Sequence, residues 1–146
     1  MGHRLFHSKL FYRIHKIHHQ YKQSLWCATI YCHPLEMVIC NILPAVIGPM
    51  ILGKKMHITT VMAWLFSIGL GSIVDHCGYE FSWSPFRLIP FTCDYGYHVF
   101  HHSHNVGNYS TFFHFWDTIL GSNKNHNEYL AKLRTKSQKL EKSKTH

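Results

Sequence analysis

Two nearly identical histidine patterns, far apart in the chain, constrain this sequence more than any other feature. H-K-I-H-H begins at His15, and H-V-F-H-H begins at His98. In each pattern the histidines occupy positions i, i+3 and i+4, which places three imidazoles on one side of an α-helix. A shorter pattern, H-R-L-F-H, puts His3 and His7 on one helix face as well. The sequence therefore predicts helices that each present several imidazoles in one direction.

The eight histidines of these three patterns indicate a metal centre. Neutral imidazole is the commonest metal ligand in proteins, and it suits iron, copper, zinc and nickel. One tetrahedral zinc ion uses only four ligands, so eight imidazoles favour two ions or one ion of higher coordination number. The alternative is a set of surface histidines in a basic protein in which 15 of 146 residues are histidine. Three patterns with helical spacing are hard to scatter by chance, and we favour the metal centre.

The scarcity of acidic residues excludes several familiar metal sites. Only seven Asp and Glu residues occur, none in a Glu-x-x-His arrangement, so the four-helix carboxylate di-iron architecture is not encoded. The His-Glu-x-x-His signature of zinc proteases is absent, and the five cysteines lack zinc-ribbon spacing. Iron with imidazole ligands and open positions is the usual arrangement for activating dioxygen. The chemistry of such a site would belong to the metal, with the protein supplying ligands and a substrate channel.

Two apolar runs occupy the middle of the chain. The first extends over residues 36–53 and the second over 58–74, and a polar turn with Lys54 and Lys55 joins them. Each run is close to the length of about 17–20 residues with which a helix crosses a bilayer. We predict a membrane hairpin over about 36–74, either spanning or re-entrant, in preference to a buried hairpin of a soluble protein. Such a hairpin returns the chain to the side from which it left.

The basic residues are concentrated before this hairpin and from Lys124 onward. That distribution is typical of a membrane protein whose two ends face the cytoplasm. Charged residues make up only 15% of the chain and aromatic residues another 15%, which argues against disorder and against a nucleic-acid partner. The predicted fold is therefore all-α, an integral membrane helical hairpin with a cytosolic histidine-rich helical cap that holds a di-metal site.

The segment before the hairpin leaves two arrangements open. No glycine or proline interrupts residues 3–23, so a single helix would place five histidines within an arc of roughly 160°. A break near Ser8 would instead give two short helices whose histidine boxes face each other. The pattern does not choose between them.

The order of the motifs resembles a known enzyme family. H-R-L-F-H, H-K-I-H-H, D-H-C-G-Y, H-V-F-H-H and F-W-D-T-I-L-G follow one another from His3 to about Gly121, as in the fatty acid hydroxylase / sterol desaturase superfamily. Y-C-H-P-L-E and G-Y-E-F-S-W-S-P-F-R-L-I-P-F are similar to the branch that contains methylsterol monooxygenase and cholesterol 25-hydroxylase. The resemblance implies a fatty acid hydroxylase-like domain over residues 1–122, followed by a basic tail over 123–146.

Position by position, the resemblance implies nine metal ligands. They are His3, His7, His15, His18, His19, His76, His98, His101 and His102. The ninth choice, His76, matches a histidine that recurs in the family's D-H-x-G-Y segment. The chain departs from the family at Val99, where an aspartate is usual, and at Tyr97, where many members have another histidine. The missing aspartate would remove an acceptor that orients a ligand imidazole.

The other six histidines are assigned weaker roles. His33 lies in a motif that the family shares and is expected to be structural, and His104 and His114 are minor candidates for metal contact. The remaining three are expected to be solvated: His57, His126 and His146.

What the resemblance implies is an enzyme. It would be a membrane-bound, O2-dependent oxidoreductase with two Fe ions, or zinc in their place after overexpression, that hydroxylates a sterol or fatty-acyl lipid. Electrons would come from NAD(P)H through a reductase and a small b-type cytochrome. The location would be the endoplasmic reticulum membrane, with the histidine boxes in the cytosol. A desaturase of the same superfamily and a catalytically silent membrane protein that keeps the fold stay open as alternatives.

Both ends of the chain carry a further expectation. Members of the superfamily have further membrane helices upstream of the first box, whereas here Met1 and Gly2 directly precede His3. We therefore expect a shortened form of a longer hydroxylase, in which the first box frays and metal binds substoichiometrically. Near the other end, Lys142 and Lys144 resemble a dilysine retrieval signal of endoplasmic-reticulum membrane proteins, and the alternative is a solvated basic tail.

Overall fold

The computed structural model describes residues 2–22, 25–79, 81–84, 88–93 and 95–144. These residues form helices and turns, with no β-strand beyond one isolated bridge between Thr92 and Phe113. The all-α prediction is therefore confirmed. The helices, in chain order, are α1 (Gly2–Phe6), α2 (Tyr12–His15), η1 (His18–Gln20), η2 (Trp26–Ile30), α3 (Pro34–Glu36), η3 (Met37–Ile42), α4 (Leu43–Leu52), η4 (Gly53–Lys55), α5 (Ile58–His76), α6 (Tyr95–His104), α7 (Phe115–Ile119) and α8 (Lys124–Lys144).

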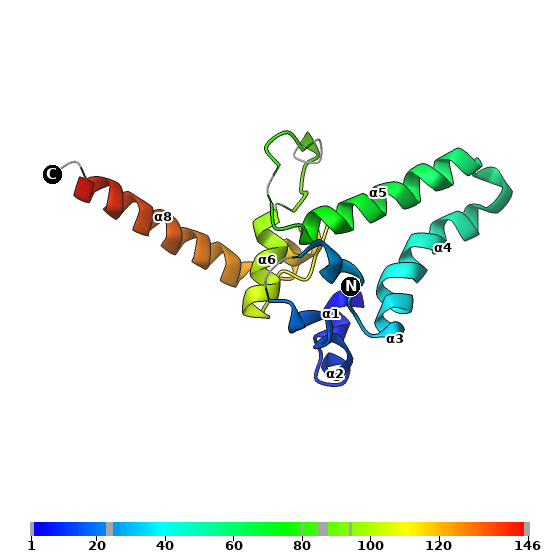
Figure 1. Ribbon diagram of the computed structural model, residues 1–146, viewed down its shortest axis with the longest axis horizontal. Coiled ribbons are helices and arrows are strands. Elements are labelled where there is room, and N and C mark those ends of the chain that lie inside the picture. The colour runs from blue at the N-terminus through cyan, green and yellow to red at the C-terminus, as the bar shows by residue number, and fades with distance from the viewer. Residues whose placement is uncertain (1, 23–24, 80, 85–87, 94, 145–146) are drawn as a thin grey trace.

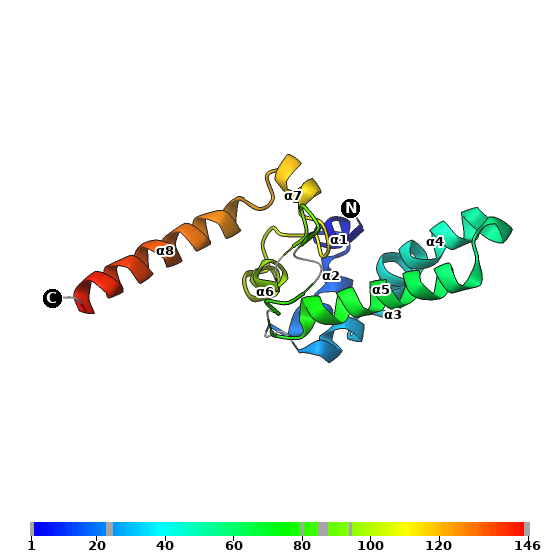
Figure 2. The same cartoon turned by 90° about the horizontal axis from the view of Figure 1, so that it is seen from above.

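A compact centre carries two projections (Figure 1). The centre contains α1, α2 and α6, and the first residues of the chain lie within it. The hairpin of α4 and α5 extends from one side of the centre, and α8 extends from the other side, in both views (Figure 2). The three histidine boxes therefore meet at the base of the hairpin, away from its tip.

The segment before the hairpin is not one helix but several short ones, α1 and α2 followed by the 3-10 helices η1 and η2. After α1, turns continue through residue 11, and α2 begins at Tyr12. Ser8 lies in these turns, and its carbonyl accepts hydrogen bonds from the N–H groups of Phe11 at 3.1 Å and Tyr12 at 2.9 Å. The chain thus breaks near Ser8. The break folds the first box back toward the second, which a single straight helix could not do.

The two apolar runs form the predicted hairpin. Its first arm is a continuous helical segment from Pro34 to Lys55, composed of α3, η3, α4 and η4, and its second arm is α5. The hairpin predicted over about 36–74 thus has helices that begin at residue 34 and end at residue 76. The segment η3 is a π-helix, whose wide i→i+5 turns are frequent near functional sites.

Both arms begin with the same capping arrangement. His33 precedes the first arm, and its Nδ1 accepts a hydrogen bond from the N–H of Leu35 at 3.2 Å. His57 precedes α5, and its Nδ1 accepts from the N–H of Thr59 at 3.3 Å. A side-chain acceptor at this position satisfies one of the N–H groups that a helix start leaves free. His33 therefore has the structural role predicted for it, and His57 is exposed as expected.

One hydrogen bond between the arms satisfies a carbonyl that a proline leaves free. Pro49 lies inside α4 and has no N–H for the carbonyl of Ala45, four residues earlier. The indole Nε1–H of Trp64, on α5, donates to that carbonyl at 2.8 Å. In a bilayer an unpaired carbonyl is costly, and a neighbouring helix is the usual source of its partner.

The hairpin exposes its apolar side chains. Both arms are long and apolar enough to cross a membrane, and only 6% of the most apolar window of either arm is buried inside the protein. A core helix of a soluble protein of this hydrophobicity would be mostly buried, because each exposed aliphatic side chain costs about 1.5–3 kcal/mol in water. The 19 residues of α5 extend over about 28 Å, close to the thickness of a bilayer's hydrocarbon core. Both arms are therefore candidate membrane-spanning helices.

The buried centre is made largely of histidine. Among the described residues, the buried apolar side chains are only Phe6, Ala28, Tyr97 and Phe100. Seven of the nine predicted ligands are buried, and the other two, His3 and His7, are half-buried. Burying a polar group costs free energy unless it has a partner, so this centre needs a set of compensating contacts.

The helix α8 corrects one expectation. Its surface is mostly exposed, as expected for a basic tail, but His126 in its first turn is buried. The His126 ring packs against Tyr97 and Phe100, with ring centroids 5.2 and 5.0 Å apart. The expectation that His126 is solvated is wrong, because this turn of α8 packs on α6. His146 and Met1 lie outside the described residues.

Candidate metal centre

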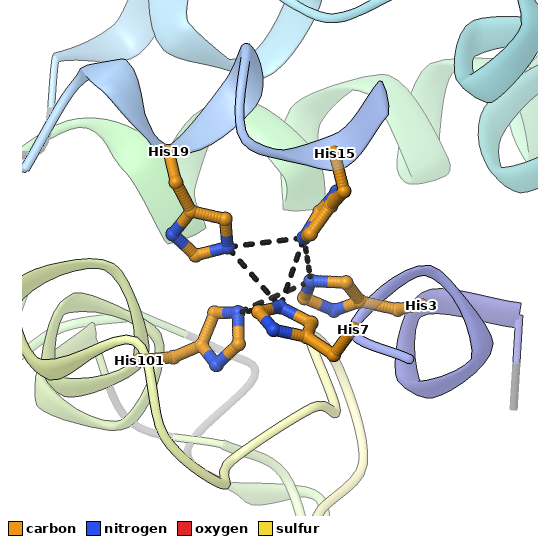
Figure 3. A group of neighbouring side chains, drawn as sticks. All are labelled: His3, His7, His15, His19 and His101. Carbon is orange, nitrogen blue, oxygen red and sulfur yellow. Dashed lines mark hydrogen bonds between the residues drawn. The ribbon is translucent and has the colours of Figure 1, made fainter. Parts of the chain in front are cut away.

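The nine predicted ligands lie in two groups, and in each group the ligand nitrogens all lie within 4.8 Å of one another. The five-histidine group contains His3, His7, His15, His19 and His101 (Figure 3). The four-histidine group contains His18, His76, His98 and His102. Figure 3 shows that the five imidazoles of the first group reach a common point from opposite sides.

Helical spacing divides each H-x-x-H-H box between the two groups. A residue at i+4 lies about 40° from residue i around a helix, whereas a residue at i+3 lies about 60° away in the other direction. His15 and His19 accordingly join the five-histidine group, and His18 joins the other. In the last box His98 and His102, at i and i+4, belong to the four-histidine group, whereas His101, at i+3, belongs to the five-histidine group. The two groups adjoin, since the rings of His19 and His102 have centroids 4.7 Å apart.

Six of the nine imidazoles use Nδ1 for a hydrogen bond that points away from their group. An oxygen of a carbonyl or carboxylate only accepts, so Nδ1 carries the hydrogen in each of them. A neutral imidazole has one ring hydrogen, and Nε2 then presents a lone pair to the group. The pairs are His3 with the Tyr109 carbonyl, His15 with the Glu36 carboxylate, His101 with the Gly107 carbonyl, His18 with the Tyr31 carbonyl, His76 with the Ser72 carbonyl, and His102 with the Tyr21 carbonyl.

These lone pairs face one another at close range. The Nε2 of His3 lies 3.0 Å from the Nε2 of His15 and 3.1 Å from that of His101. With all three rings neutral, none of these nitrogens carries a hydrogen, and the contacts are then repulsive unless a cation lies between them. Nitrogens bound to one ion at about 2.1 Å lie about 3.0 Å apart when they are at right angles. The donor set and its spacing therefore fit a metal ion.

Burial keeps these imidazoles neutral. Removal from water, with repulsion from neighbouring histidines, lowers the pKa of His7 and of His101 to about 3 and that of His102 to about 2. The same causes hold the pKa of His3 and of His98 well below their ordinary value. Neutral imidazole is the form that binds metal, so protons compete weakly for these nitrogens.

The first arm of the hairpin supplies Glu36, a residue to which the sequence patterns assigned no role. Its side chain is buried, and Oε1 lies 2.6 Å from Nδ1 of His15. The sequence contained a signal for it, because Glu36 is an acidic residue at the start of an apolar run. A charged side chain in such a place needs a polar or charged partner. The sequence therefore indicated that Glu36 has a partner within the site.

The loop after α6 supports the five-histidine group from the other side. The carbonyls of Gly107 and Tyr109 accept hydrogen bonds from His101 and His3. Gly107 has a φ of +64°, and a Cβ placed there would lie 2.1 Å from the carbonyl oxygen of Ser122. Only glycine fits this position, so the loop geometry that holds two imidazoles depends on one residue.

Asp117 fixes this loop. Its Oδ2 accepts hydrogen bonds from the hydroxyl of Tyr97 at 2.9 Å and from the N–H of Ser110 at 2.8 Å. Its Oδ1 accepts from the hydroxyl of Ser122 at 2.7 Å. Burial raises the pKa of Asp117, but these hydrogen bonds outweigh burial and hold the pKa below its ordinary value. The carboxylate is therefore the charged form at neutral pH.

Comparison with known proteins identifies the family. The model of the fatty acid hydroxylase family matches residues 1–122, most of the chain. The chain belongs to the fatty acid hydroxylase family. This confirms the resemblance drawn from the order of the histidine boxes.

The curated relatives of this chain include proteins named as methylsterol monooxygenases or oxidases. It is 35% identical over 139 residues to a putative methylsterol monooxygenase of Dictyostelium discoideum, covering 94% of the chain and 49% of the relative. It is 31% identical to the C-4 methylsterol oxidase of Schizosaccharomyces pombe, covering 90% of the chain and 45% of the relative. It is 34% identical to methylsterol monooxygenase 1 of Rattus norvegicus, covering 95% of the chain and 47% of the relative. The chain spans about half the length of these relatives, and no solved structure matches it.

The two departures from the family pattern occupy different surroundings. Tyr97 lies outside both histidine groups and points its hydroxyl at Asp117. Val99 is half-buried and directly follows His98, whose Nδ1 is buried with no partner among the described residues. His98 therefore lacks the Nδ1 acceptor that six of the other ligand imidazoles have, and its ring is less firmly oriented.

The two minor candidates lie outside both groups of this fatty acid hydroxylase family site. His104 stacks on Phe100, with ring centroids 4.2 Å apart, and its Nδ1 donates to the Phe100 carbonyl at 3.2 Å. His114 contacts the hydroxyl of Thr118 at 3.2 Å. His104 is exposed and His114 is half-buried, and these local contacts account for both.

Proposed function

We propose that this chain contains the metal centre of a membrane-bound, non-haem di-iron oxygenase that hydroxylates a lipid. The observation that carries the proposal is the convergence of nine imidazoles into two adjoining groups. One group would hold one ion through His3, His7, His15, His19 and His101, and the other through His18, His76, His98 and His102. Two groups with the same donor type support two ions of the same metal.

A pair of iron ions in these groups would supply the activation of O2. The protein's part is to orient the imidazoles through the carbonyls and the carboxylate behind them, and to keep them neutral by burial. Buried walls around the groups also limit the access of water. No side chain near the groups is needed as a nucleophile.

The hairpin and the relatives support a lipid substrate. His76 is the last residue of α5, and Glu36 lies at the start of the first arm, so both groups are tied to the base of a membrane hairpin. A lipid lying in the bilayer can approach that base without leaving its apolar surroundings. The relatives named for methylsterol oxidation favour a sterol over a fatty-acyl chain as the substrate.

Hydroxylation consumes one O2, two electrons and two protons, and yields the alcohol and water. We propose NAD(P)H as the electron source, through a reductase and a b-type cytochrome. We place the protein in the endoplasmic reticulum membrane with the histidine groups in the cytosol. The basic residues near the base of the hairpin and along α8 support that orientation.

The test is metal analysis of the detergent-purified chain, followed by turnover assays. We expect iron in both groups, up to two ions per chain, or zinc in their place after overexpression. A 4-methylsterol and a free fatty acid are then supplied with O2, NADPH, reductase and cytochrome, and products are identified by mass spectrometry. An added oxygen atom supports hydroxylation, loss of two hydrogens supports desaturation, and metal without any product supports the silent alternative. Absence of bound transition metal would refute the proposal.

A further inference from the structure

The two histidine groups differ in what lies behind their imidazoles. Among the described residues, Glu36 is the only carboxylate that contacts any of the nine histidines, through Nδ1 of His15. In the four-histidine group the Nδ1 contacts go to backbone carbonyls, those of Tyr31, Ser72 and Tyr21. One group therefore has a full negative charge behind it, and the other has only dipoles.

The charge of Glu36 acts at the centre of its group. The Nε2 of His15 lies 2.9–3.0 Å from the Nε2 atoms of His3, His7 and His19 (Figure 3). A carboxylate hydrogen-bonded to Nδ1 fixes the ring orientation and strengthens Nε2 as a donor to a metal. Glu36 thus strengthens an imidazole on which three of the other four converge.

The burial of Glu36 also indicates a cation. Its side chain is 6% exposed, and Oε2 is buried with no partner among the described residues. A buried carboxylate costs several kcal/mol unless nearby charge compensates it, and the hydrogen bond to His15 engages only Oε1. A metal ion in the five-histidine group would supply the missing positive charge.

We propose that Glu36 makes the two groups unequal, so that the five-histidine group binds its ion more tightly and fills first. This inference rests on the proposed metal centre. Glu36 is a positioning residue, since it acts through His15. Its charge also reaches His18 in the other group, where it partly counters the lowering of that pKa by burial. No hydrogen bond joins Glu36 to His18, so its effect on the four-histidine group is smaller.

The experiment titrates the metal-free full chain in detergent with Co2+, and reads its visible absorption against a competing chelator. Wild type should fill in two steps of different affinity. Glu36→Gln keeps an oxygen that accepts from His15 and removes only the charge. We expect it to weaken the tighter step about 10–100-fold and to leave the weaker step nearly unchanged. Glu128→Gln, at an exposed position of α8, is the matched control and should leave both steps unchanged.

Two ligand variants show which histidine group gives rise to each Co2+-binding step. His98→Ala removes a ligand of the four-histidine group, and His19→Ala removes one of the five-histidine group without touching the Glu36 contact. Glu36→Gln should weaken Co2+ binding in the His98→Ala background and have little effect in the His19→Ala background. Equal weakening of both steps, or of neither, would overturn the inference while leaving the metal centre in place. A wild-type chain that binds no Co2+ would overturn the metal centre itself.

Discussion

The hydroxyl of Tyr97 donates a hydrogen bond to Oδ2 of Asp117 at 2.9 Å, and both side chains are buried. Tyr97 directly precedes His98 on α6, and Asp117 lies on α7. The same carboxylate accepts from Ser110, which directly follows Tyr109 of the metal-supporting loop, and from Ser122, whose carbonyl accepts from the N–H of Asn108 in that loop. This contact therefore joins the helix of the last histidine box to the loop that orients His101 and His3.

Asp117→Asn tests this connection. The substitution weakens hydrogen bonds that now end on a charge, each of which contributes about 1.5–3 kcal/mol. We expect a loss of about 3 kcal/mol in stability, seen as a lower midpoint of thermal unfolding of the metal-free chain in detergent. Tyr97→Phe removes only one of the three bonds and should show a smaller loss. An unchanged midpoint in Asp117→Asn would mean that the loop is held by other contacts.

The difference in unfolding midpoint between wild type and Asp117→Asn should depend on pH, in a direction set by the pKa of Asp117. The folded-state pKa of Asp117 lies below its ordinary value, so the carboxylate stabilises the fold fully above the ordinary value of about 4. This stabilisation is lost as the pH falls through the lower folded-state pKa. The difference in unfolding midpoint between wild type and Asp117→Asn should be constant above about pH 5 and shrink below about pH 4. A difference that grows on acidification would contradict the assignment.

Gly107→Ala should damage the five-histidine group selectively. The new Cβ would lie 2.1 Å from a backbone oxygen, and the φ of +64° is unfavourable for alanine, with strain of about 1–3 kcal/mol before any clash. The loop must move, and the carbonyls that orient His101 and His3 move with it. We expect metal content to fall from two ions to about one per chain. Gly48→Ala, at a helical glycine with open space around it, is the control and should retain both ions.

Single histidine substitutions should remove metal one group at a time. His15→Ala is expected to lose the ion of the five-histidine group, and His98→Ala that of the four-histidine group, with turnover abolished in both. His104→Ala, on the same helix as His98 but outside both groups, should retain metal and turnover. Elemental analysis of purified protein gives the metal content. Two or more ligand variants that retain full activity would remove the metal assignment from their box.

The hydrogen bond from Trp64 to Ala45 should depend on Pro49. Trp64→Phe removes the indole donor and leaves the Ala45 carbonyl unpaired, at an expected loss of about 1 kcal/mol in hairpin stability. In a Pro49→Ala background the alanine N–H supplies the helical partner, so Trp64→Phe should then cost much less. Thermal stability of the four variants in detergent measures this coupling. Equal losses in both backgrounds would show that Trp64 acts through packing alone.

The sequence by itself determined the fold class, the hairpin and the set of nine histidines that come together. The hairpin and eight of the nine histidines depend on local periodicity, because i, i+3, i+4 spacing places imidazoles on one side of a helix and a long apolar run needs a nonaqueous environment. The ninth, His76, comes from the resemblance of its D-H-C-G-Y segment to the family. The family follows from the order of the boxes. The role of the nine histidines as metal ligands stays a prediction until an ion is measured.

Only the tertiary structure decided how those histidines divide. Helical spacing separates His18 and His101 from their box neighbours, but which residues of the different boxes share a group depends on how α2, η1 and α6 approach one another, which no local pattern contains. The same holds for Glu36, which is distant from the boxes in sequence, and for His126, which packing on α6 buries. Periodicity fixes which face of a helix a side chain occupies, whereas contacts between helices fix what that face meets.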